Sequence, residues 1–282
     1  MKYSNIIEMD ICSSFGCFTK PFSNTGGLLT YLIPPKTSII GMVGAILGYE
    51  FDKYEPIDEN NRKYEIEELY DIKIAIQPLF DLKTKRVTFN YGYGNEKGLK
   101  NIKQDVLVEP YYKLYLSFPD SLEDKETLFL ERVKNKFSIY SLYMGRNEFL
   151  LNYQYIQSLP FSSYILNSDN QKIFFKDKPR IYGSLNRKNV KKTKLSSEEH
   201  LTSGEIYNHN RHQNIRNLKS FYEYVIKEFP IKRKNFTDFV YSDVSFYSIL
   251  ENEECFFSKI ELKDNFDLEL VKIGENKWIS MI

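Results

Sequence analysis

The side chains that could support catalysis or metal binding are few and do not gather into a recognisable set. The three histidines, His200, His209 and His212, all lie in a basic stretch of the C-terminal half. One of them could act as a general base, but no matched triad accompanies it. His209 and His212 also lack the further ligands that a zinc site needs. We therefore interpret the histidines as exposed loop residues, and we predict no catalytic residue, no metal and no cofactor.

The spacing of the cysteines predicts neither disulfide bonds nor a metal site, and it bears only on the cellular compartment. Cys12, Cys17 and Cys255 form neither a paired framework nor a metal-binding spacing. A reducing, cytoplasmic setting is the expectation for such usage. The N-terminus lacks a basic region followed by an apolar core, so we expect no signal peptide.

Residues 18–48 combine a loop rich in turn formers with a glycine-rich helix. The helix follows a Pro-Pro pair, with Thr37 or Ser38 as its expected cap. Its apolar run is too short for a membrane span, which needs about 20 residues. No Gly-Lys-Ser/Thr follows the glycines, so it is not a P-loop. The loop before it, from Lys20 to Gly27, is the better candidate for ligand contact, because loops carry function.

The expected role of the helix is tight packing. Its small residues, which share one face, are Gly41, Gly44, Ala45 and Gly48. They would bring the helix close to its sheet. The apolar residues expected to face that sheet are Ile39, Val43, Ile46 and Leu47.

Charge is balanced overall but segregated along the chain. The 282 residues include 39 basic and 38 acidic side chains, for a net charge of +1. No global field therefore indicates a nucleic-acid or membrane partner. Residues 172–194, however, contain Lys or Arg at nine positions against one acid, Asp177. Such a patch suits a polyanion, although charge runs are more often solvated faces.

The first 157 residues predict the order strand, helix, strand, excursion, strand, helix, strand. The predicted strands and helices are 5–18 (strand), 37–48 (helix), 72–80 and 111–118 (strands), and 125–136 (helix), followed by 138–144 and 148–156 (strands) around a turn at Gly145 and Arg146. Residues 85–91 could be a further strand or one arm of a projecting hairpin. A short helix is expected at 63–70. Glycines and lysines between residues 90 and 110 indicate a projecting segment. This βαββαβ plan is ferredoxin-like and is shared by the RNA-recognition motif, so it alone decides no function.

Residues 158–282 predict a smaller, β-rich C-terminal module. The short β-like runs are 172–175, 255–257 and 277–280, and one helix is expected near residues 218–229. The fold class is therefore α+β, with a domain at 1–157 and a module at 158–282.

Three motifs, in this order, resemble CRISPR-associated protein 5 of type I Cascade complexes, most closely the type I-B form. They are FTKP…TYLIPPKTSIIGMVGAILG, QDVLVEPYYKLYL and SIYSLYMGRNEF. The resemblance covers about the first 157 residues. It implies a repeat-associated mysterious protein (RAMP) fold, in which a ferredoxin-like domain carries a β-hairpin thumb, here at about residues 84–110.

The resemblance also implies a function in antiviral defence. Proteins of this kind cap one end of the Cascade ribonucleoprotein and hold the 5′ handle of the CRISPR RNA (crRNA). Their implied partners are the first backbone subunit (CRISPR-associated protein 7 family), the large subunit and, through the complex, target DNA; no membrane is implied. A single-stranded handle needs cations for its phosphates and contacts to splayed bases. The predicted RNA-binding residues are Lys20, Ser23, Asn24, Thr25, Gly26, Gly27, Lys97, Lys100, Lys103, Gln104, Gly145 and Arg146, with Tyr31, Tyr91 and Tyr143 as stacking or core residues.

Two alternatives stay open at this point. Type I-C relatives are endoribonucleases that process precursor crRNA with a Tyr, Lys and His set, and no matched set is evident here. A purely structural Cascade subunit with little RNA contact is the other alternative. We predict a non-catalytic RNA-binding subunit.

Overall fold

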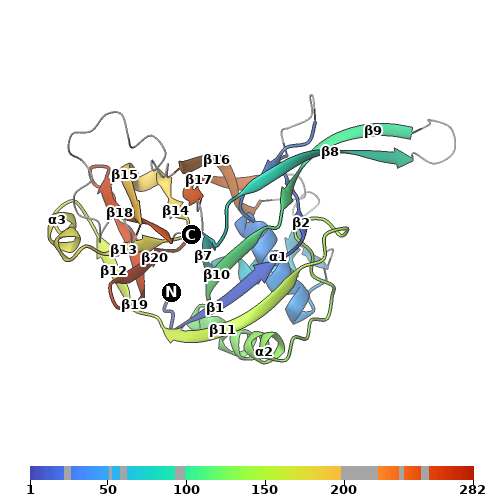
Figure 1. Ribbon diagram of the computed structural model, residues 1–282. Coiled ribbons are helices and arrows are strands. Elements are labelled where there is room, and N and C mark those ends of the chain that lie inside the picture. Colours follow the sequence, from blue (N-terminus) through green and yellow to red (C-terminus); the bar gives the residue numbers. More distant parts are fainter. Residues whose placement is uncertain are drawn as a thin grey trace, which may run out of the picture.

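The computed structural model describes residues 1–21, 27–50, 53–57, 62–92, 99–197, 222–234, 238–248 and 254–282. The fold is mixed α+β and strands predominate among the described elements. Figure 1 shows two β-rich parts side by side, with a long hairpin that projects from the N-terminal part. None of the helices in the described ranges is long and apolar enough to cross a membrane.

An antiparallel four-stranded sheet forms the centre of the N-terminal part. Its spatial order is β11–β1–β10–β7. The strands and the two long helices are β1 (Asn5–Cys12), α1 (Lys36–Leu47), β7 (Lys73–Pro78), β10 (Tyr111–Ser117), α2 (Glu123–Lys134) and β11 (Asn152–Pro160). Along the chain these elements follow the predicted order of strand, helix, two strands, helix and strand.

Smaller elements connect and extend this sheet. They are β2 (Phe15–Gly16), β3 (Phe18–Thr19), β4 (Thr30–Tyr31), β5 (Tyr54–Pro56), β6 (Arg62–Tyr64), the 3-10 helices η1 (Glu65–Asp71) and η2 (Asp120–Leu122), and the projecting strands β8 (Lys83–Gly92) and β9 (Leu99–Val108). The predicted strand at 5–18 is thus three short strands. The strands predicted at 138–144 and in the first part of 148–156 are wrong, because this segment holds only a bridge between Tyr143 and Leu150 before β11 begins.

Helices α1 and α2 cover one face of the sheet, as Figure 1 shows. Met9 of β1 and Leu114 of β10 are register partners on that face. They pack in one core with Ile39, Val43 and Ile46 of α1, as predicted. Full burial of each such side chain stabilises the fold by about 1.5–3 kcal/mol.

The cap of α1 differs from the prediction. No side chain caps the helix; instead the Pro35 carbonyl accepts bonds from the N–H groups of Ser38 (2.9 Å) and Ile39 (3.1 Å). The helix begins at Lys36, so Thr37 and Ser38 already lie inside its first turn and cannot serve as N-cap. At the other end Gly48 has φ +86°, the left-handed conformation that glycine adopts freely.

The small-residue face of α1 does not approach the sheet, which corrects the expected reason for its glycines. A Cβ on Gly44 would come within 2.8 Å of Ile66 Cδ1, so the close neighbour is η1. A Cβ on Gly41 would meet nothing within 4 Å. Close packing therefore explains the glycine at position 44 but not the one at position 41.

The C-terminal part contains a six-stranded sheet and a three-stranded sheet. The first has the order β12–β19–β20–β13–β18–β15 and the second β14–β17–β16. Their bounds are β12 (Ser163–Leu166), β13 (Arg180–Tyr182), β14 (Leu185–Asn186), β15 (Val190–Ser197), β16 (Tyr222–Arg233), β17 (Phe239–Ser248), β18 (Cys255–Leu262), β19 (Leu268–Gly274) and β20 (Lys277–Ser280), with short helices α3 (Gln171–Phe174), η3 (Phe175–Asp177) and η4 (Arg187–Asn189).

Two C-terminal predictions are wrong and two are confirmed. The helix expected near residues 218–229 is strand β16 in its described portion, and the strand expected at 172–175 is mostly helix α3. The β-like runs at 255–257 and 277–280 lie in β18 and β20, as predicted. The strand β16 pairs with β17 and places Ile226 and Phe229 in the core that α1 shares.

The two large sheets meet face to face over part of their area. Ile6, Ala75 and Tyr115 on the helix-free face of the N-terminal sheet pack with Tyr182, Phe256, Val271 and Ile279 of the C-terminal sheet. The contact covers only part of each sheet face.

Candidate nucleic-acid interface

The projecting hairpin is joined to the body at its lower end by several chain segments. β8 and β9 pair from Lys83 with Val108 to Gly92 with Leu99. β2 pairs with the lower end of β9. The hairpin runs from Lys83 to Val108, close to the bounds of about 84–110 that the resemblance implies for a thumb.

The chain that leaves the Lys20 loop runs directly beside β9. The Leu28 N–H donates to the Lys103 carbonyl (2.8 Å), and the Asp105 N–H donates to the Leu28 carbonyl (2.9 Å). Gly27 has φ +138°, and a Cβ there would lie 3.0 Å from the Lys103 carbonyl oxygen. The glycine therefore permits a backbone approach that a larger residue would obstruct.

The turn at Gly145 lies against the start of the same loop. Gly145 has φ +86°, and a Cβ there would lie 2.1 Å from the carbonyl oxygen of Cys17. The Cys17 N–H donates to the Met144 carbonyl at 2.9 Å. Only glycine fits this position, so the motif residue fixes how the next residue, Arg146, leaves the turn.

Arg146 reaches the hairpin through a buried glutamine. Its Nη1 donates to Gln104 Oε1, and the Gln104 amide in turn donates to Cys17 Sγ. Gln104 is 0% exposed. Arg146 also lies 3.1 Å from Glu148 Oε1, with its Cζ 5.7 Å from the centre of the Phe89 ring. We call the junction of Leu28, Lys103, Gln104, Gly145 and Arg146 the hairpin root.

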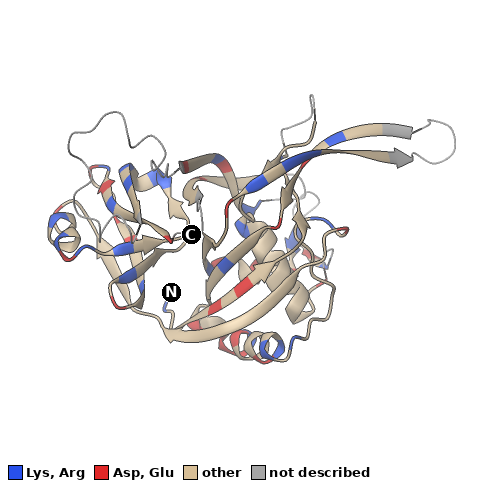
Figure 2. Ribbon diagram, viewed as in Figure 1, with Lys and Arg blue, Asp and Glu red and all other residues tan. Residues whose placement is uncertain are grey.

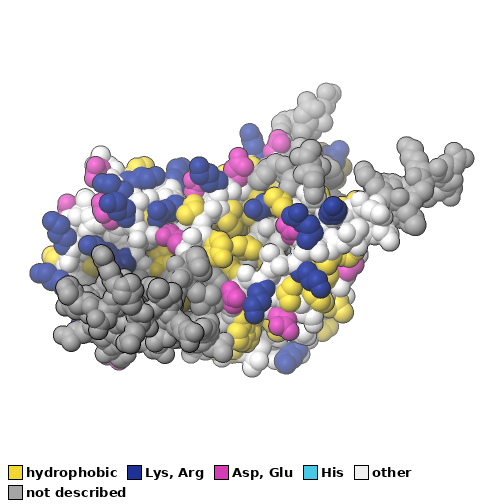
Figure 3. Space-filling model, turned by 45° about the horizontal axis from the view of Figure 1, so that its top comes forward, with side chains coloured by type: hydrophobic (Ala, Val, Ile, Leu, Met, Phe, Trp, Pro, Cys, Tyr) yellow, Lys and Arg dark blue, Asp and Glu magenta, His cyan; other side chains and the backbone are white. Residues whose placement is uncertain are grey.

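The hairpin root thus unites residues from all three sequence motifs. Lys103 is exposed and Arg146 is partly exposed, so both cations can be reached from solvent. Lys20 lies on the adjoining strand segment, where its N–H donates to Leu29 and its Nζ is 5.4 Å from the Tyr31 ring centre. Figure 3 shows further Lys and Arg side chains near the start of the projection.

The burial of two predicted contact residues speaks against a direct RNA contact. Gln104 uses its amide internally, as described above. Tyr31 is 1% exposed, and its hydroxyl donates to the Glu228 carbonyl at 2.9 Å. Desolvation by burial, with Tyr241 and Glu228 nearby, raises the pKa of Tyr31. Gln104 and Tyr31 are therefore buried residues that can only position the exposed side chains around them. Tyr143 is 44% exposed, so its ring is accessible for stacking on a base.

The remaining predicted residues are only partly described. Tyr91 and Lys100 are register partners on the hairpin, and their side chains are outside the described set. Ser23, Asn24, Thr25, Gly26 and Lys97 lie outside the described residues, as do all three histidines.

The sequence analysis missed two features of the hairpin. Phe89 lies beside Arg146, and Arg86 Nε lies 2.8 Å from Asp105 Oδ1 across the ladder. The hydrogen bond to Asp105, together with its charge, raises the pKa of Arg86. The alternation of polar and apolar residues along the two strands would have indicated both, once the hairpin register was known.

The helix-free face of the N-terminal sheet is acidic and hydrogen-bonded to itself. Glu8, 5% exposed, pairs with Lys113 and accepts a bond from Gln157 (2.8 Å). Asp10 accepts from Tyr111 (3.0 Å), and desolvation by burial raises the pKa of Asp10. Such a surface repels phosphates, in contrast to the hairpin root.

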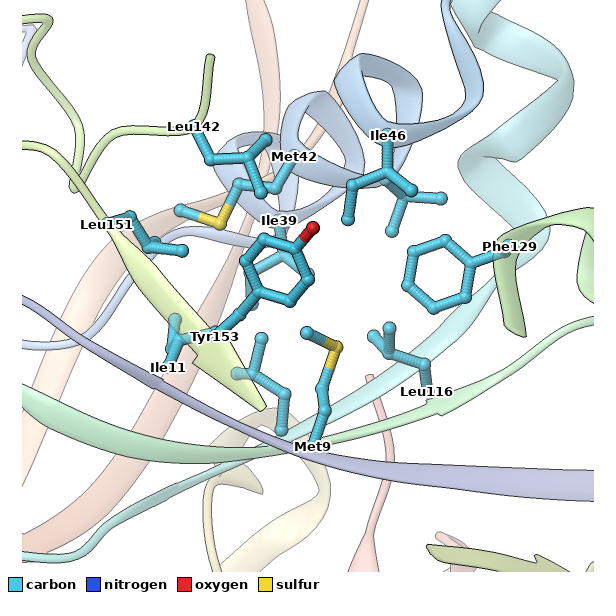
Figure 4. A pocket seen from close by; sticks show the side chains of 12 residues that line it. Met9, Ile11, Ile39, Met42, Ile46, Leu116, Phe129, Leu142, Leu151 and Tyr153 are labelled. Atoms are coloured by element: carbon cyan, nitrogen blue, oxygen red, sulfur yellow. The ribbon is translucent and has the colours of Figure 1, made fainter. Parts of the chain in front are cut away.

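The cavity between the central sheet and its helices is too small to be a ligand site. An apolar cavity of about 10 Å³ lies between the sheet and the helices, lined by Met9, Ile39, Phe129 and others (Figure 4). That is close to the smallest space that holds one water molecule. No group of three His, Cys, Asp or Glu side chains within the described ranges is arranged to hold a metal ion.

Comparisons with known proteins give one matching family and several similar solved structures. A family model described as CRISPR-associated protein (Cas_Cas5) matches residues 6–201. A chain of a solved CRISPR RNA-guided surveillance complex is 10% identical, with a TM-score of 0.44, and the match covers 90% of this chain and 91% of that one. A CRISPR protein from Archaeoglobus fulgidus is 12% identical, with a TM-score of 0.43 and 98% of each chain covered. None of the curated proteins compared with the sequence matches it.

Proposed function

The chain belongs to the CRISPR-associated protein family Cas5, and on that premise we propose that it is a non-catalytic RNA-binding subunit of a type I Cascade effector complex. In this proposal the protein caps one end of the complex and holds the 5′ handle of the crRNA. It would act in the cytoplasm, in antiviral defence, and the type I-B form is the closest in motif.

The arrangement of elements supports the finer fold assignment. The order β11–β1–β10–β7, with two helices on one face, agrees with a ferredoxin-like RAMP domain. The hairpin of β8 and β9 is then the thumb. We keep 1–157 as this domain and 158–282 as the C-terminal module.

The hairpin root is the single observation that carries the proposal. Three segments far apart in sequence are bonded there, so that Lys103 and Arg146 are held at one junction beside Leu28 and Gln104. Tyr143, two residues before Gly145, has an exposed ring. Cations for phosphates together with an aromatic face are what single-stranded RNA recognition needs. On the acidic face of the central sheet Lys113 is paired with Glu8 and Tyr111 is bonded to Asp10, so the root is the better RNA-binding surface.

Protein partners have a separate surface available. Phe137, Ile139 and Tyr140, in the segment after α2, are 51%, 46% and 44% exposed. Apolar side chains gathered on a surface are typical of interaction sites. They support contact with the large subunit or the first backbone subunit, of the CRISPR-associated protein 7 family, while target DNA is reached through the complex.

Two alternatives belong to other classes. In the first, the protein is an endoribonuclease that processes precursor crRNA. Incubation of the purified protein with labelled repeat RNA decides this, and specific cleavage without partners would overturn our proposal. In the second, the protein is a purely structural subunit.

Charge reversal on the hairpin tests the second alternative. Lys97→Glu, Lys100→Glu and Lys103→Glu together should abolish most of the handle binding and make its salt dependence shallower. Reversal of Lys125, Lys134 and Lys136, on and just after α2, is the matched control and should leave binding unchanged. Unchanged handle binding and complex assembly in the hairpin variant would remove the thumb from the RNA interface.

A further inference from the structure

Two neighbouring strands of the C-terminal sheet place lysines of like charge against one another. β15 is the edge strand of that sheet, and its Lys194 is the direct register partner of Lys259 on β18. Both are exposed, as is Lys192, two residues before Lys194. Side chains two residues apart in a strand share a face, here about 7 Å apart. We call Lys192, Lys194 and Lys259 the lysine face.

Among the residues that the structure describes, little offsets this repulsion. Like charges directly opposite in an antiparallel pair destabilise the sheet. Glu261 is the register partner of Lys192, but its Oε1 lies 3.3 Å from the Nζ of Lys191. Within the described ranges, none of the three lysines of the lysine face forms an ion pair.

The lysine face is on the side of the six-stranded sheet that is turned away from the C-terminal core. Phe256 lies on the same side, where it packs against the N-terminal sheet. The alternating neighbours, Thr193 and Ile260, are register partners on the opposite side, where Ile260 is buried in the C-terminal core. Because β15 and β18 pack against this core, the backbone that carries the three lysines is held in place, unlike that of a loop.

The same side of the sheet continues with further cations. Arg180 of β13 and Lys277 of β20 are register partners, and Lys277 lies 3.8 Å from Glu254. Figure 2 shows Lys and Arg positions on these strands and on β15. Figure 3 shows Lys and Arg side chains on this part of the molecule, with some Asp and Glu among them.

We infer that the lysine face binds the phosphodiester backbone of a nucleic acid, at a site separate from the hairpin root. A polyanion laid across β15 and β18 would convert the repulsion between Lys194 and Lys259 into attraction for phosphates. Lysines hold phosphates as point charges and read no sequence, so the contact is independent of base identity.

The surroundings favour a nucleic acid over an acidic protein. A protein–protein interface has an apolar centre with charges at its rim. Among the described residues, none of the large hydrophobic side chains that are exposed lies on β13, β15 or β18. A face that is cationic without an apolar centre is typical of phosphate-backbone binding.

The test measures salt dependence with probes that lack the repeat. The full chain and the variant Lys192→Gln, Lys194→Gln, Lys259→Gln are titrated by fluorescence anisotropy with single-stranded RNA, single-stranded DNA and duplex DNA at several salt concentrations. Loss of three phosphate contacts should make the slope of log K against log salt shallower by about 2 for single strands and about 3 for duplex. The probe that shows this change identifies the nucleic acid.

Controls separate charge from folding and from the handle site. The arginine variant of the same three positions should keep the wild-type slope, and a Lys→Gln change at Lys125, Lys134 and Lys136 should leave it unaltered. Binding of repeat RNA through the hairpin root is measured in parallel, so that failure of one site is distinguishable from failure of the other. Equal slopes for wild type and variant with all three probes would overturn the inference, as would capture of polyglutamate by this face without any binding of nucleic acid.

Discussion

Replacing Gln104 with leucine should weaken the binding of handle RNA, although Gln104 itself cannot touch the RNA. The side chain is 0% exposed and its Oε1 accepts a bond from Arg146 Nη1. Leucine fills a similar volume without an acceptor, so Arg146 loses the partner that directs it from the Gly145 turn toward the hairpin. Gln104 is in this account a positioning residue.

The magnitude follows from the two bonds that are lost. A hydrogen bond to a charged group contributes about 1.5–3 kcal/mol, and the bond from the amide to Cys17 Sγ contributes less. Arg146 keeps Glu148 and is 22% exposed, so water can replace part of what is lost. We expect the free energy of unfolding to fall by about 1–2 kcal/mol and the handle affinity to fall by about tenfold, equivalent to about 1.4 kcal/mol.

The assay is a double-mutant cycle with a matched control. Handle-RNA affinity and urea unfolding are measured for Gln104→Leu, for Arg146→Gln and for the double variant. The coupling should be about 1–2 kcal/mol, with the double variant no weaker in RNA binding than Arg146→Gln alone. Gln77→Leu removes another buried glutamine, 4% exposed, that accepts a bond from Tyr115. It should destabilise the protein to a similar extent without changing RNA affinity.

Additive effects in this cycle would refute the reasoning, because they would show that Gln104 does not act through Arg146. An equal loss of RNA affinity in Gln77→Leu would do the same, because general destabilisation would then explain both results.

Three further predictions concern separate parts of the structure. Gly145→Ala should lower the free energy of unfolding by at least about 2 kcal/mol in urea, from the positive φ and the clash with the Cys17 carbonyl; a loss below about 1 kcal/mol would contradict this geometry. Desolvation by burial lowers the pKa of Lys36 from 10.5 to about 8. Since the unfolded chain then binds more protons between these values, stability should rise by about 2 kcal/mol from pH 7.5 to pH 9.5. Lys36→Met, unfolded at the same two pH values, should lack that increase, and an equal increase in the variant would assign it to other groups. Tyr31→Phe should cost about 1 kcal/mol through the lost bond to Glu228 and leave handle affinity unchanged; an affinity loss above about threefold, or about 0.7 kcal/mol, would return Tyr31 to the RNA interface.

Elements whose pattern is local could be predicted, and those decided by distant pairing could not. The strand β10 and the helix α2 follow from residues next to one another, and both lie within about two residues of the expected bounds. The strand β16 was expected as a helix, because Tyr, Val, Ile and Phe are spaced compatibly with either. Its pairing with β17 and the burial of Phe229 against the core shared with α1 determine the outcome.

The candidate site shows the same division. Each motif could be recognised as a loop or turn, and glycine at positions 27 and 145 suits the close backbone contacts that the structure shows. That Gln104 is buried could not be predicted, because its partner Arg146 lies 42 residues away. Whether Gln104 is buried depends on how the hairpin packs against the Gly145 turn. The residues of β8 and β9 alone do not determine that packing.

The central sheet explains why RNA binding is assigned to the hairpin root and not to a sheet face. In the RNA-recognition motif one face of such a sheet binds bases with exposed aromatics. Here the corresponding face has Glu8 and Asp10, and its apolar part is covered by Tyr182, Phe256 and Ile279 of the C-terminal sheet. A phosphate brought to this face would meet a buried carboxylate already paired with Lys113, and it would have to displace that pair. Cations with solvent access are present instead at the hairpin root, on Lys103 and Arg146, and on the lysine face of β15 and β18. The C-terminal module therefore has two consequences for recognition: it closes the usual surface of the central sheet, and it adds a separate cationic surface of its own.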